Sequence, residues 1–346
     1  MRKKYNDLEL DYNLSLFSSN TIKFLKYALK DSKTVPGHDQ YLGNKLLFKS
    51  RWLRFIDMCW CFVRFGAPTN YYKFFEFYKY NNAYRDTFLT SRRLTALIQK
   101  RTNLEAYFLF DDKAKFNKAY ARFMKRKWMT VDNETTVDRL QSFLNENGRI
   151  IVKPIDSHQG MGVFVVDKGQ EELLESVAEK AKNGERFICE EVVENISCLR
   201  EVNPSSLNTM RINTFIDKAG NVVFLGNSLR AGAAGSPVDN LHGGGVMYHV
   251  NERGFIDQCG YDSNRGKHYF HPSTNKKMIG MEIPMYDELM KYMVEVASVN
   301  KNAKLIGWDV AITENGFELI EGNFGPDECI MQDDGVGRYR YIIENW

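Results

Sequence analysis

Residues 306–323 read IGWDVAITENGFELIEGN, two runs rich in apolar and β-branched side chains on either side of an Asn-Gly pair. Asn-Gly between such runs is a strong signal for a tight turn joining antiparallel strands, so the stretch predicts a β-hairpin. Asp309 stands in the first strand, and Glu321 and Asn323 stand near the end of the second. Because side chains alternate along a strand, Glu321 and Asn323 point to the same face.

The pairing of the two strands decides whether Asp309 joins Glu321. A two-residue Asn315-Gly316 turn pairs Asp309 with Gly322 and directs it away from Glu321, whereas a three-residue loop with Gly316 as a left-handed bulge pairs Asp309 with Glu321. The apolar alternation favours the first pairing. The cost of uncompensated carboxylates beside apolar strands favours the second, because a hard cation such as Mg²⁺ would remove that cost. We predict the second pairing and a metal site; the alternative is an exposed strand end.

Charge is distributed unevenly along the 346 residues. Residues 1–130 hold 26 Lys and Arg against 11 Asp and Glu, and the remainder holds 21 against 33. A basic first third suits an anionic surface such as lipid head groups, nucleic acid or an acidic polysaccharide; the alternative is a solvated basic helical face. The composition, with 43% hydrophobic and 26% charged residues, excludes the disordered and fibrous classes.

The first residues, MRKKYNDLELDYN, lack the apolar segment of a signal peptide. The most apolar later run, FIDMCWCFVRF, is short and is interrupted by Asp57, so we expect a buried helix there rather than a membrane span. Six cysteines without a CxxC pair suit reduced thiols. We therefore expect a cytoplasmic protein, with peripheral contact at the inner face of the membrane through its basic region.

Helical and β-rich patterns occupy different parts of the chain. Apolar residues recur at three- and four-residue spacing in 1–105 and again in 111–129, which predicts helices. From Arg149 onward, short β-rich runs are interrupted by helical stretches, which is typical of an α+β enzyme core. We expect three parts: a basic helical region at 1–105 and two α+β subdomains at 106–190 and 191–346.

A glycine-containing loop follows Lys153 in VKPIDSHQGMGV. Gly160 and Gly162 permit backbone N–H groups to approach a phosphate closely, and the Lys153 ammonium adds a point charge. The loop joins two predicted strands, so it is neither a Walker A site nor a dinucleotide fingerprint, both of which open a helix. A plain hairpin turn with an exposed lysine is the alternative.

Two further segments combine polar side chains with β-rich or glycine-rich sequence. Arg211 lies inside a predicted strand, LNTMRINTF, and Arg230 is the second residue of the glycine-rich LRAGAAGSPVDNLHGGGV. A buried arginine needs an anionic partner, which for Arg211 is either a ligand or a glutamate in a structural ion pair. The glycine-rich stretch also carries Asp239, Asn240 and His242, and we expect it to be mobile and to close over a ligand.

In chain order, IIVKP with its glycine loop, CEEVVEN after a strand, and WDVAITENGFELIEGN resemble the ATP-grasp superfamily. The sequence is most similar to the sugar-transfer-associated branch, which is found with genes for bacterial exopolysaccharides. The similarity covers roughly residues 70–330 and includes YYKFFEFYKYNNAYRDTFLTSRR, LFDDKAKF, NTMRINTF and LRAGAAGSPVDNLHGGG. The helical start departs from it, because many members begin with a strand-rich substrate domain.

The resemblance implies ATP and Mg²⁺ bound in a cleft between two α+β subdomains. Lysines would contact the phosphates, the glycine loop would fold over them, a hinge would read adenine through its backbone, and one glutamate would lie near the ribose. In that order these residues are Lys113 and Lys153; Ser157, His158, Gln159, Gly160, Met161 and Gly162; Glu190, Glu191, Val192 and Val193; and Glu194.

The resemblance also implies a metal site and a catalytic group. Asp309, Glu321 and Asn323 would hold Mg²⁺. Arg211 and Arg230 would act with Lys153 on the γ-phosphate or on an acyl phosphate.

The predicted function is an ATP-dependent carboxylate–amine ligase that acts through an acyl phosphate on a bacterial surface polysaccharide, capsule or precursor. Its partners would be a carboxylate and an amine or sugar acceptor, without nucleic acid. One alternative is a kinase or another ligase on the same fold. The other is a non-catalytic protein that docks on an anionic polymer or a membrane.

Overall fold

A computed structural model of the chain describes residues 19–33, 35, 50–101, 104–155, 161–233, 244–263 and 266–346. The chain forms two compact units: Met1–Thr102 together with Asp327–Trp346, and Asn103–Pro326. The first division falls close to the expected boundary at residue 105. The last twenty residues group with the helical unit and not, as we expected, with the C-terminal α+β subdomain.

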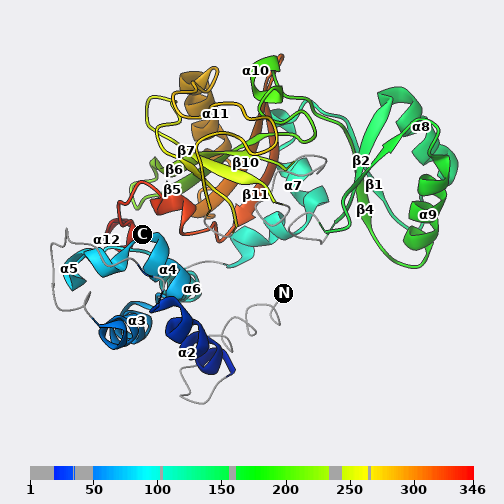
Figure 1. Cartoon of the computed structure of the whole chain (residues 1–346). Helices are drawn as coiled ribbons and strands as arrows, with labels where there is room; N and C mark the ends of the chain where they lie inside the picture. The colour runs from blue at the N-terminus through cyan, green and yellow to red at the C-terminus, as the bar shows by residue number, and fades with distance from the viewer. Residues whose placement is uncertain are drawn as a thin grey trace. The chain divides into compact units, whose positions relative to one another are not determined.

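The first unit, called here the helical unit, contains helices and no strand among its described residues, as predicted (Figure 1). Aromatic side chains dominate its core, including Phe65, Tyr72, Phe77 and Phe88. Helix α3 of this core ends at Phe65, because the left-handed backbone of Gly66 (φ 65°) turns the chain and lets the Gly66 N–H bond the last helical turn. The helices are α2 (Ser19–Asp31), α3 (Arg51–Phe65), α4 (Thr69–Phe74), η1 (Phe77–Lys79), α5 (Asn82–Arg85), α6 (Ser91–Arg101), η5 (Ile330–Gln332) and α12 (Tyr339–Asn345).

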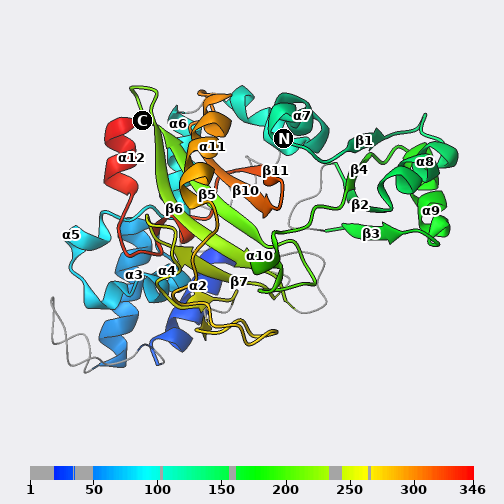
Figure 2. The same cartoon turned by 90° about the horizontal axis from the view of Figure 1, so that it is seen from above.

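The second unit contains two antiparallel sheets, and the smaller has the strand order β1-β4-β2-β3. The amphipathic helices α8 and α9 pack against this sheet, and their apolar side chains form one core with those of the strands (Figure 2). The elements up to this point are η2 (Leu104–Asp111), α7 (Lys113–Ala119), η3 (Ala121–Phe123), β1 (Trp128–Val131), α8 (Val137–Asn147), β2 (Arg149–Pro154), β3 (Phe164–Asp167), α9 (Glu171–Lys182) and β4 (Phe187–Glu191). The prediction of a helix over residues 111–129 was wrong, because α7 ends at Ala119 and β1 begins at Trp128.

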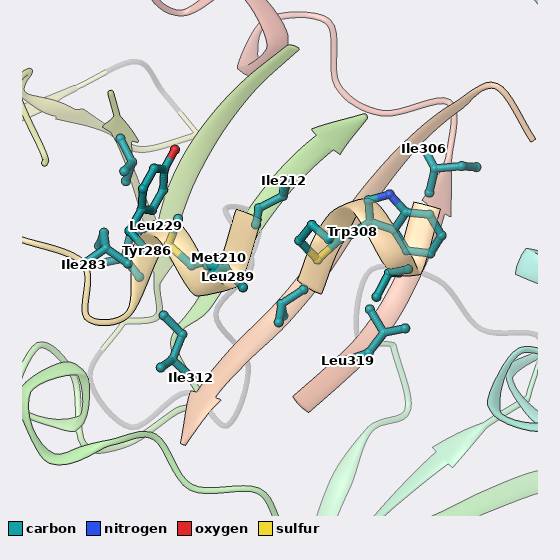
Figure 3. Close-up of a cluster of buried hydrophobic side chains, with 14 of the residues drawn as sticks. Met210, Ile212, Leu229, Ile283, Tyr286, Leu289, Ile306, Trp308, Ile312 and Leu319 are labelled. Carbon is teal, nitrogen blue, oxygen red and sulfur yellow. The ribbon is translucent and has the colours of Figure 1, made fainter. Parts of the chain in front are cut away.

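The larger sheet has the strand order β11-β10-β5-β6-β7-β8-β9. The remaining elements of the second unit are α10 (Ser197–Arg200), β5 (Thr209–Ile216), β6 (Val222–Ala231), β7 (Val246–Val250), β8 (Gly260–Tyr261), β9 (Lys267–His268), α11 (Tyr286–Ser298), β10 (Leu305–Thr313) and β11 (Gly316–Phe324). Side chains of α11 pack with Ile212, Leu229 and Trp308 of the sheet in one cluster (Figure 3). The predicted α+β class is confirmed.

The β10–β11 hairpin uses neither of the two predicted turns. Thr313 pairs with Gly316, so Glu314 and Asn315 form the turn, and the Thr313 hydroxyl closes it by donating to the Gly316 carbonyl at 2.8 Å. A bulge at Ile320 then shifts the register by one residue, so Asp309 does pair with Glu321. We had assumed one register along the whole hairpin. The bulge allows both the apolar alternation and the pairing of the two acids. Between the turn and the bulge the apolar residues share one face, and beyond the bulge Asp309 and Glu321 share the other.

No helix among the described residues is long and apolar enough to cross a membrane.

Candidate active site

The larger sheet has one apolar face and one polar face. Trp308 points into the core with Ile212, whereas Asp309 alternates with Trp308 and lies opposite Arg211 across β10 and β5. On the other side of β10, Glu321 pairs with Asp309. Three neighbouring strands therefore bring these charged side chains together on the face away from the core.

Asp309 is the centre of this polar face. Arg211 donates from Nε to Oδ1 at 2.6 Å and from Nη2 to Oδ2 at 2.9 Å, and Arg230 donates from Nη1 to Oδ2 at 2.8 Å. Burial alone would raise the pKa of Asp309, but the two guanidinium groups outweigh it and hold that pKa well below its usual range. The carboxylate is therefore ionised at physiological pH.

Glu321 has a different environment from its neighbour Asp309. Asn323 Nδ2 donates to Glu321 Oε1 at 3.0 Å and to Asp309 Oδ2 at 3.3 Å, and Glu321 forms no ion pair within the described residues. Burial raises the pKa of Glu321, and the adjacent charge of Asp309 raises it further. The face thus carries a carboxylate whose negative charge is disfavoured until another cation approaches.

The chemistry of this donor set fits the predicted Mg²⁺. Two adjacent carboxylates and one amide supply oxygen ligands, and Mg²⁺ usually takes only one or two carboxylates and fills its shell with water and substrate phosphates. The part of the chain that the structure describes holds no cluster of three His, Cys, Asp or Glu side chains suited to a metal. Asp309 is already bound by two arginines, so Glu321, which forms no ion pair within the described residues, is the carboxylate that most needs a cation.

Arg126 links the two sheets, and the sequence analysis did not single it out. Its Nη1 donates to Glu318 Oε1 at 2.7 Å and to the Leu319 carbonyl at 2.6 Å in β11. Its Nη2 lies 3.0 Å from Glu190 Oε1 in β4. Arg126 is 6% exposed, so these contacts hold a buried cation between two buried carboxylates. A lone arginine before a strand gave no signal of this role, because its partners are far away in the sequence.

Lys153 lies near the end of β2, and Lys113 contacts the backbone at the same end of that strand. Lys153 Nζ lies 2.5 Å from Glu190 Oε2, and Lys113 Nζ donates to the Pro154 and Ile155 carbonyls at 3.1 and 3.2 Å. Burial would raise the pKa of Glu190, but Arg126 and Lys153 outweigh it and lower that pKa well below its usual range. Both lysines thus stand where the glycine loop leaves β2.

A pocket opens beside these residues in the second unit. It is lined by Lys153 of the small sheet, by Glu190–Asn195 at and beyond the end of β4, and by Ile320 of the large sheet. Glu190 and Glu191 are paired within the sheet, whereas the backbone of Val193 makes no hydrogen bond to another described residue. The Val193 backbone is therefore available to a planar, hydrogen-bonding ligand at the pocket wall.

Residues 92–336 match the family described as sugar-transfer associated ATP-grasp. The chain belongs to this family. Membership confirms the predicted ATP-grasp fold. No curated protein matches the sequence.

Three solved ligases resemble this ATP-grasp protein in fold. D-alanyl-alanine synthetase A from Vibrio cholerae O1 biovar eltor is 14% identical, with a TM-score of 0.44 over 69% of this chain and 61% of its own. A D-alanine–D-alanine ligase from Bacillus anthracis complexed with ATP is 12% identical, with a TM-score of 0.44 over 70% and 68%. D-cycloserine synthetase DcsG is 13% identical, with a TM-score of 0.43 over 68% and 69%. The chain thus spans about three fifths of the length of the first of these.

Some predicted site residues of this ATP-grasp protein lie outside the described residues. These are Ser157, His158, Gln159 and Gly160 of the glycine loop, and Asp239, Asn240 and His242 of the second glycine-rich stretch. At the described end of the first loop, Met161 is exposed and Gly162 has a φ of +73°. A side chain at Gly162 would strain the backbone and would stand 3.0 Å from the Pro154 ring, which explains glycine there.

The remaining predicted residues fall into two groups. The residues predicted to hold the metal and to act in catalysis form one hydrogen-bonded cluster, and their roles remain predictions: Asp309, Glu321, Asn323, Arg211 and Arg230. The predicted ATP-binding residues Lys153 and Glu190–Glu194 line the pocket. Glu194 also forms an exposed ion pair with Arg200 at 3.1 Å.

Proposed function

We propose that this protein is an ATP-dependent carboxylate–amine ligase. The observation that carries the proposal is the cluster on the polar face of the large sheet: Asp309 and Glu321 lie side by side with Arg211 and Arg230 in contact with Asp309. Such a cluster offers cations to a phosphoryl group and carboxylates to a metal, which is what phosphoryl transfer from ATP needs.

The pocket would hold the nucleotide, with adenine against Val193 and the triphosphate near Lys153. Mg²⁺ bound by Glu321, Asp309 and Asn323 would neutralise phosphate charge. Lys153 now contacts Glu190, so binding a phosphate would replace one anionic partner with another. Arg126 remains to neutralise Glu190 after that exchange. The lysine can therefore move without leaving a buried carboxylate uncompensated.

The chemistry would proceed in two steps. An oxygen of the substrate carboxylate attacks the γ-phosphorus of ATP, the bond to the β-phosphate bridging oxygen breaks, and ADP leaves. Arg211 and Arg230 stabilise the transferred phosphoryl group. An amine then attacks the acyl carbon, the bond to the phosphate oxygen breaks, and free phosphate leaves with the loss of one amine proton. The family's association with sugar transfer supports a polysaccharide or its precursor as the setting.

The decisive experiment measures phosphate release from ATP in the presence of amino acids, amino sugars and uronic acids. Release of ADP and free phosphate only when a carboxylate and an amine are both present supports the ligase. Phosphate retained on a sugar acceptor would instead identify a kinase on the same fold. If ATP with Mg²⁺ raises the melting temperature of neither the wild type nor Asp309→Asn, the proposal fails.

A further inference from the structure

Helix α3 of the helical unit carries a stripe of exposed apolar side chains. Trp52, Ile56, Trp60 and Val63 are 59%, 59%, 49% and 56% exposed. Their spacing of four, four and three residues places them on one side of the helix. The opposite side of α3, which includes Met58, faces the core and is already buried. The stripe is therefore a second apolar face on a helix that needs only one to fold.

Helix α2 repeats the pattern beside α3. Ile22, Leu25 and Leu29 are exposed at spacings of three and four residues, whereas Phe24 is buried. Phe24 stacks on Phe62 of α3, with ring centroids 4.1 Å apart. The two helices are thus held together through their buried sides, and each presents an apolar stripe outside the core. These stripes, Trp52, Ile56, Trp60 and Val63 with Ile22, Leu25 and Leu29, are called here the α2–α3 face.

Exposed charges on these two helices have one sign. Both acids are buried in ion pairs: Asp31 with Lys73 at 3.1 Å, and Asp57 with Arg85 at 2.7 Å. The exposed charged residues are basic, namely Lys23, Lys26, Lys30 and Arg64. Lysine and arginine flank apolar stripes in helices that lie in a membrane interface, and tryptophan is enriched at the same depth.

We propose that the α2–α3 face docks the protein on a membrane surface rich in anionic lipid. The apolar side chains would enter the boundary between head groups and acyl chains, with Trp52 and Trp60 at head-group depth. The lysines would contact lipid phosphates from the border of the stripe. Docking would be peripheral, because no described helix can cross a bilayer.

The combination of charge and apolar surface favours lipid over other occupants. A second copy of the same face would bring lysines against lysines, and the repulsion would oppose self-association. A soluble anionic polysaccharide would satisfy the lysines but would leave Trp52, Ile56 and Trp60 in water. A bilayer that contains phosphatidylglycerol satisfies both features at once.

The test is co-sedimentation of the full chain with vesicles of phosphatidylcholine containing 40% phosphatidylglycerol, compared with phosphatidylcholine alone. We expect binding to the anionic vesicles, weakened by salt. The triple variant Trp52→Gln, Ile56→Ser, Trp60→Gln should bind at least tenfold more weakly, and so should Lys23→Glu, Lys26→Glu, Lys30→Glu. A matched control, Tyr269→Gln with Phe270→Gln, removes two exposed aromatic side chains elsewhere and should leave binding unchanged.

Several outcomes would overturn the proposal. They are the absence of wild-type binding to the anionic vesicles, equal binding by the wild type and the Trp52/Ile56/Trp60 variant, and equal loss in the matched control. A dimer that dissociates only in the Trp52/Ile56/Trp60 variant would assign the face to a second copy. Binding to a soluble polyuronate without vesicle binding would assign it to a polysaccharide. Unchanged melting temperatures of both variants show that the substitutions leave the fold intact.

Discussion

The helical unit and the large sheet each bury an aspartate bound by arginine, but the two arrangements differ. In the helical unit, Asp57 accepts hydrogen bonds from both terminal nitrogens of Arg85, each at 2.7 Å, and from the Tyr72 hydroxyl at 2.7 Å. On the sheet, Asp309 accepts from two arginines and also lies beside a second carboxylate, that of Glu321.

The difference separates a structural ion pair from a candidate binding site. Around Asp57, one buried acid meets one buried cation, and a hydroxyl uses the remaining acceptor. Around Asp309, the arginines bind one acid, whereas Glu321 has no ion pair within the described residues and accepts a hydrogen bond from the Asn323 amide. A closed pair stabilises the fold only if both members stay. An open cluster costs stability in the absence of its ligand, and that cost is typical of functional sites.

The largest predicted effect is on the closed pair. Asp57→Asn would leave the Arg85 guanidinium buried without its carboxylate, so we expect the helical unit to lose about 3–5 kcal/mol of stability. Hydrogen exchange in α3 and α5 measures this loss. Replacing both partners, with Asp57→Leu and Arg85→Met, should recover much of it because no buried charge then remains. Unchanged exchange in Asp57→Asn would contradict the classification of this pair as structural.

The second prediction concerns the open cluster. Glu321→Gln keeps the shape of the side chain but removes the charge that we propose binds the metal, so ATP turnover should fall by about 100-fold or more. The melting temperature should stay the same or rise, because burial and Asp309 both disfavour the charge of Glu321. Phosphate release and thermal melting provide the two measurements. If Glu321→Gln lowered the melting temperature and kept full ATP turnover, Glu321 would be a structural residue and not part of a binding site.

A third buried acid, Glu328, extends the comparison to pH. The Tyr71 hydroxyl donates to its Oε2 at 2.7 Å, and burial, aided by Asp327, raises the pKa of Glu328 to about 7. A carboxyl group whose pKa is raised in the folded state stabilises that state below its unfolded pKa and loses the contribution as pH rises through the folded value. Between about pH 4.5 and pH 7, this acid should cost the helical unit on the order of 3 kcal/mol.

Glu328→Gln isolates that contribution, because the amide does not titrate. Melting curves of the wild type and the variant should diverge between pH 5 and pH 7.5, with the wild type losing more stability. The unit also contains other titrating groups, so the difference between the two proteins is the quantity to follow. Parallel curves would show that Glu328 is ionised throughout this range.

The smallest predicted effect concerns an exposed pair. Arg200 and Glu194 lie 3.1 Å apart with both side chains more than half exposed. Solvent screens such a pair, so Arg200→Ala should change stability by less than about 1 kcal/mol. Isothermal titration with ATP should likewise show less than a threefold change if Glu194 reaches the ribose without help from Arg200. A tenfold loss of ATP affinity would make Arg200 a direct contact.

Local patterns in the sequence predicted many of the elements and the strand face on which two candidate site residues lie. The alternation around Glu321 and Asn323 placed both side chains on one face, and helical spacing identified the first unit as helical. The ordered motifs from Lys153 to Asn323 identified the family, which the match over residues 92–336 confirmed. These features depend on neighbours a few residues apart, so the sequence alone contains them.

Tertiary structure decided which of these residues meet. The bulge at Ile320 brought Glu321 opposite Asp309, and the strand order placed Arg211 on the other side of Asp309, although 98 residues separate the two in sequence. Arg126 gained its role only from the contact with Glu190 and Glu318 in different sheets. Periodicity specifies the face of each strand, whereas long-range pairing specifies its neighbours, and no local pattern encodes that choice.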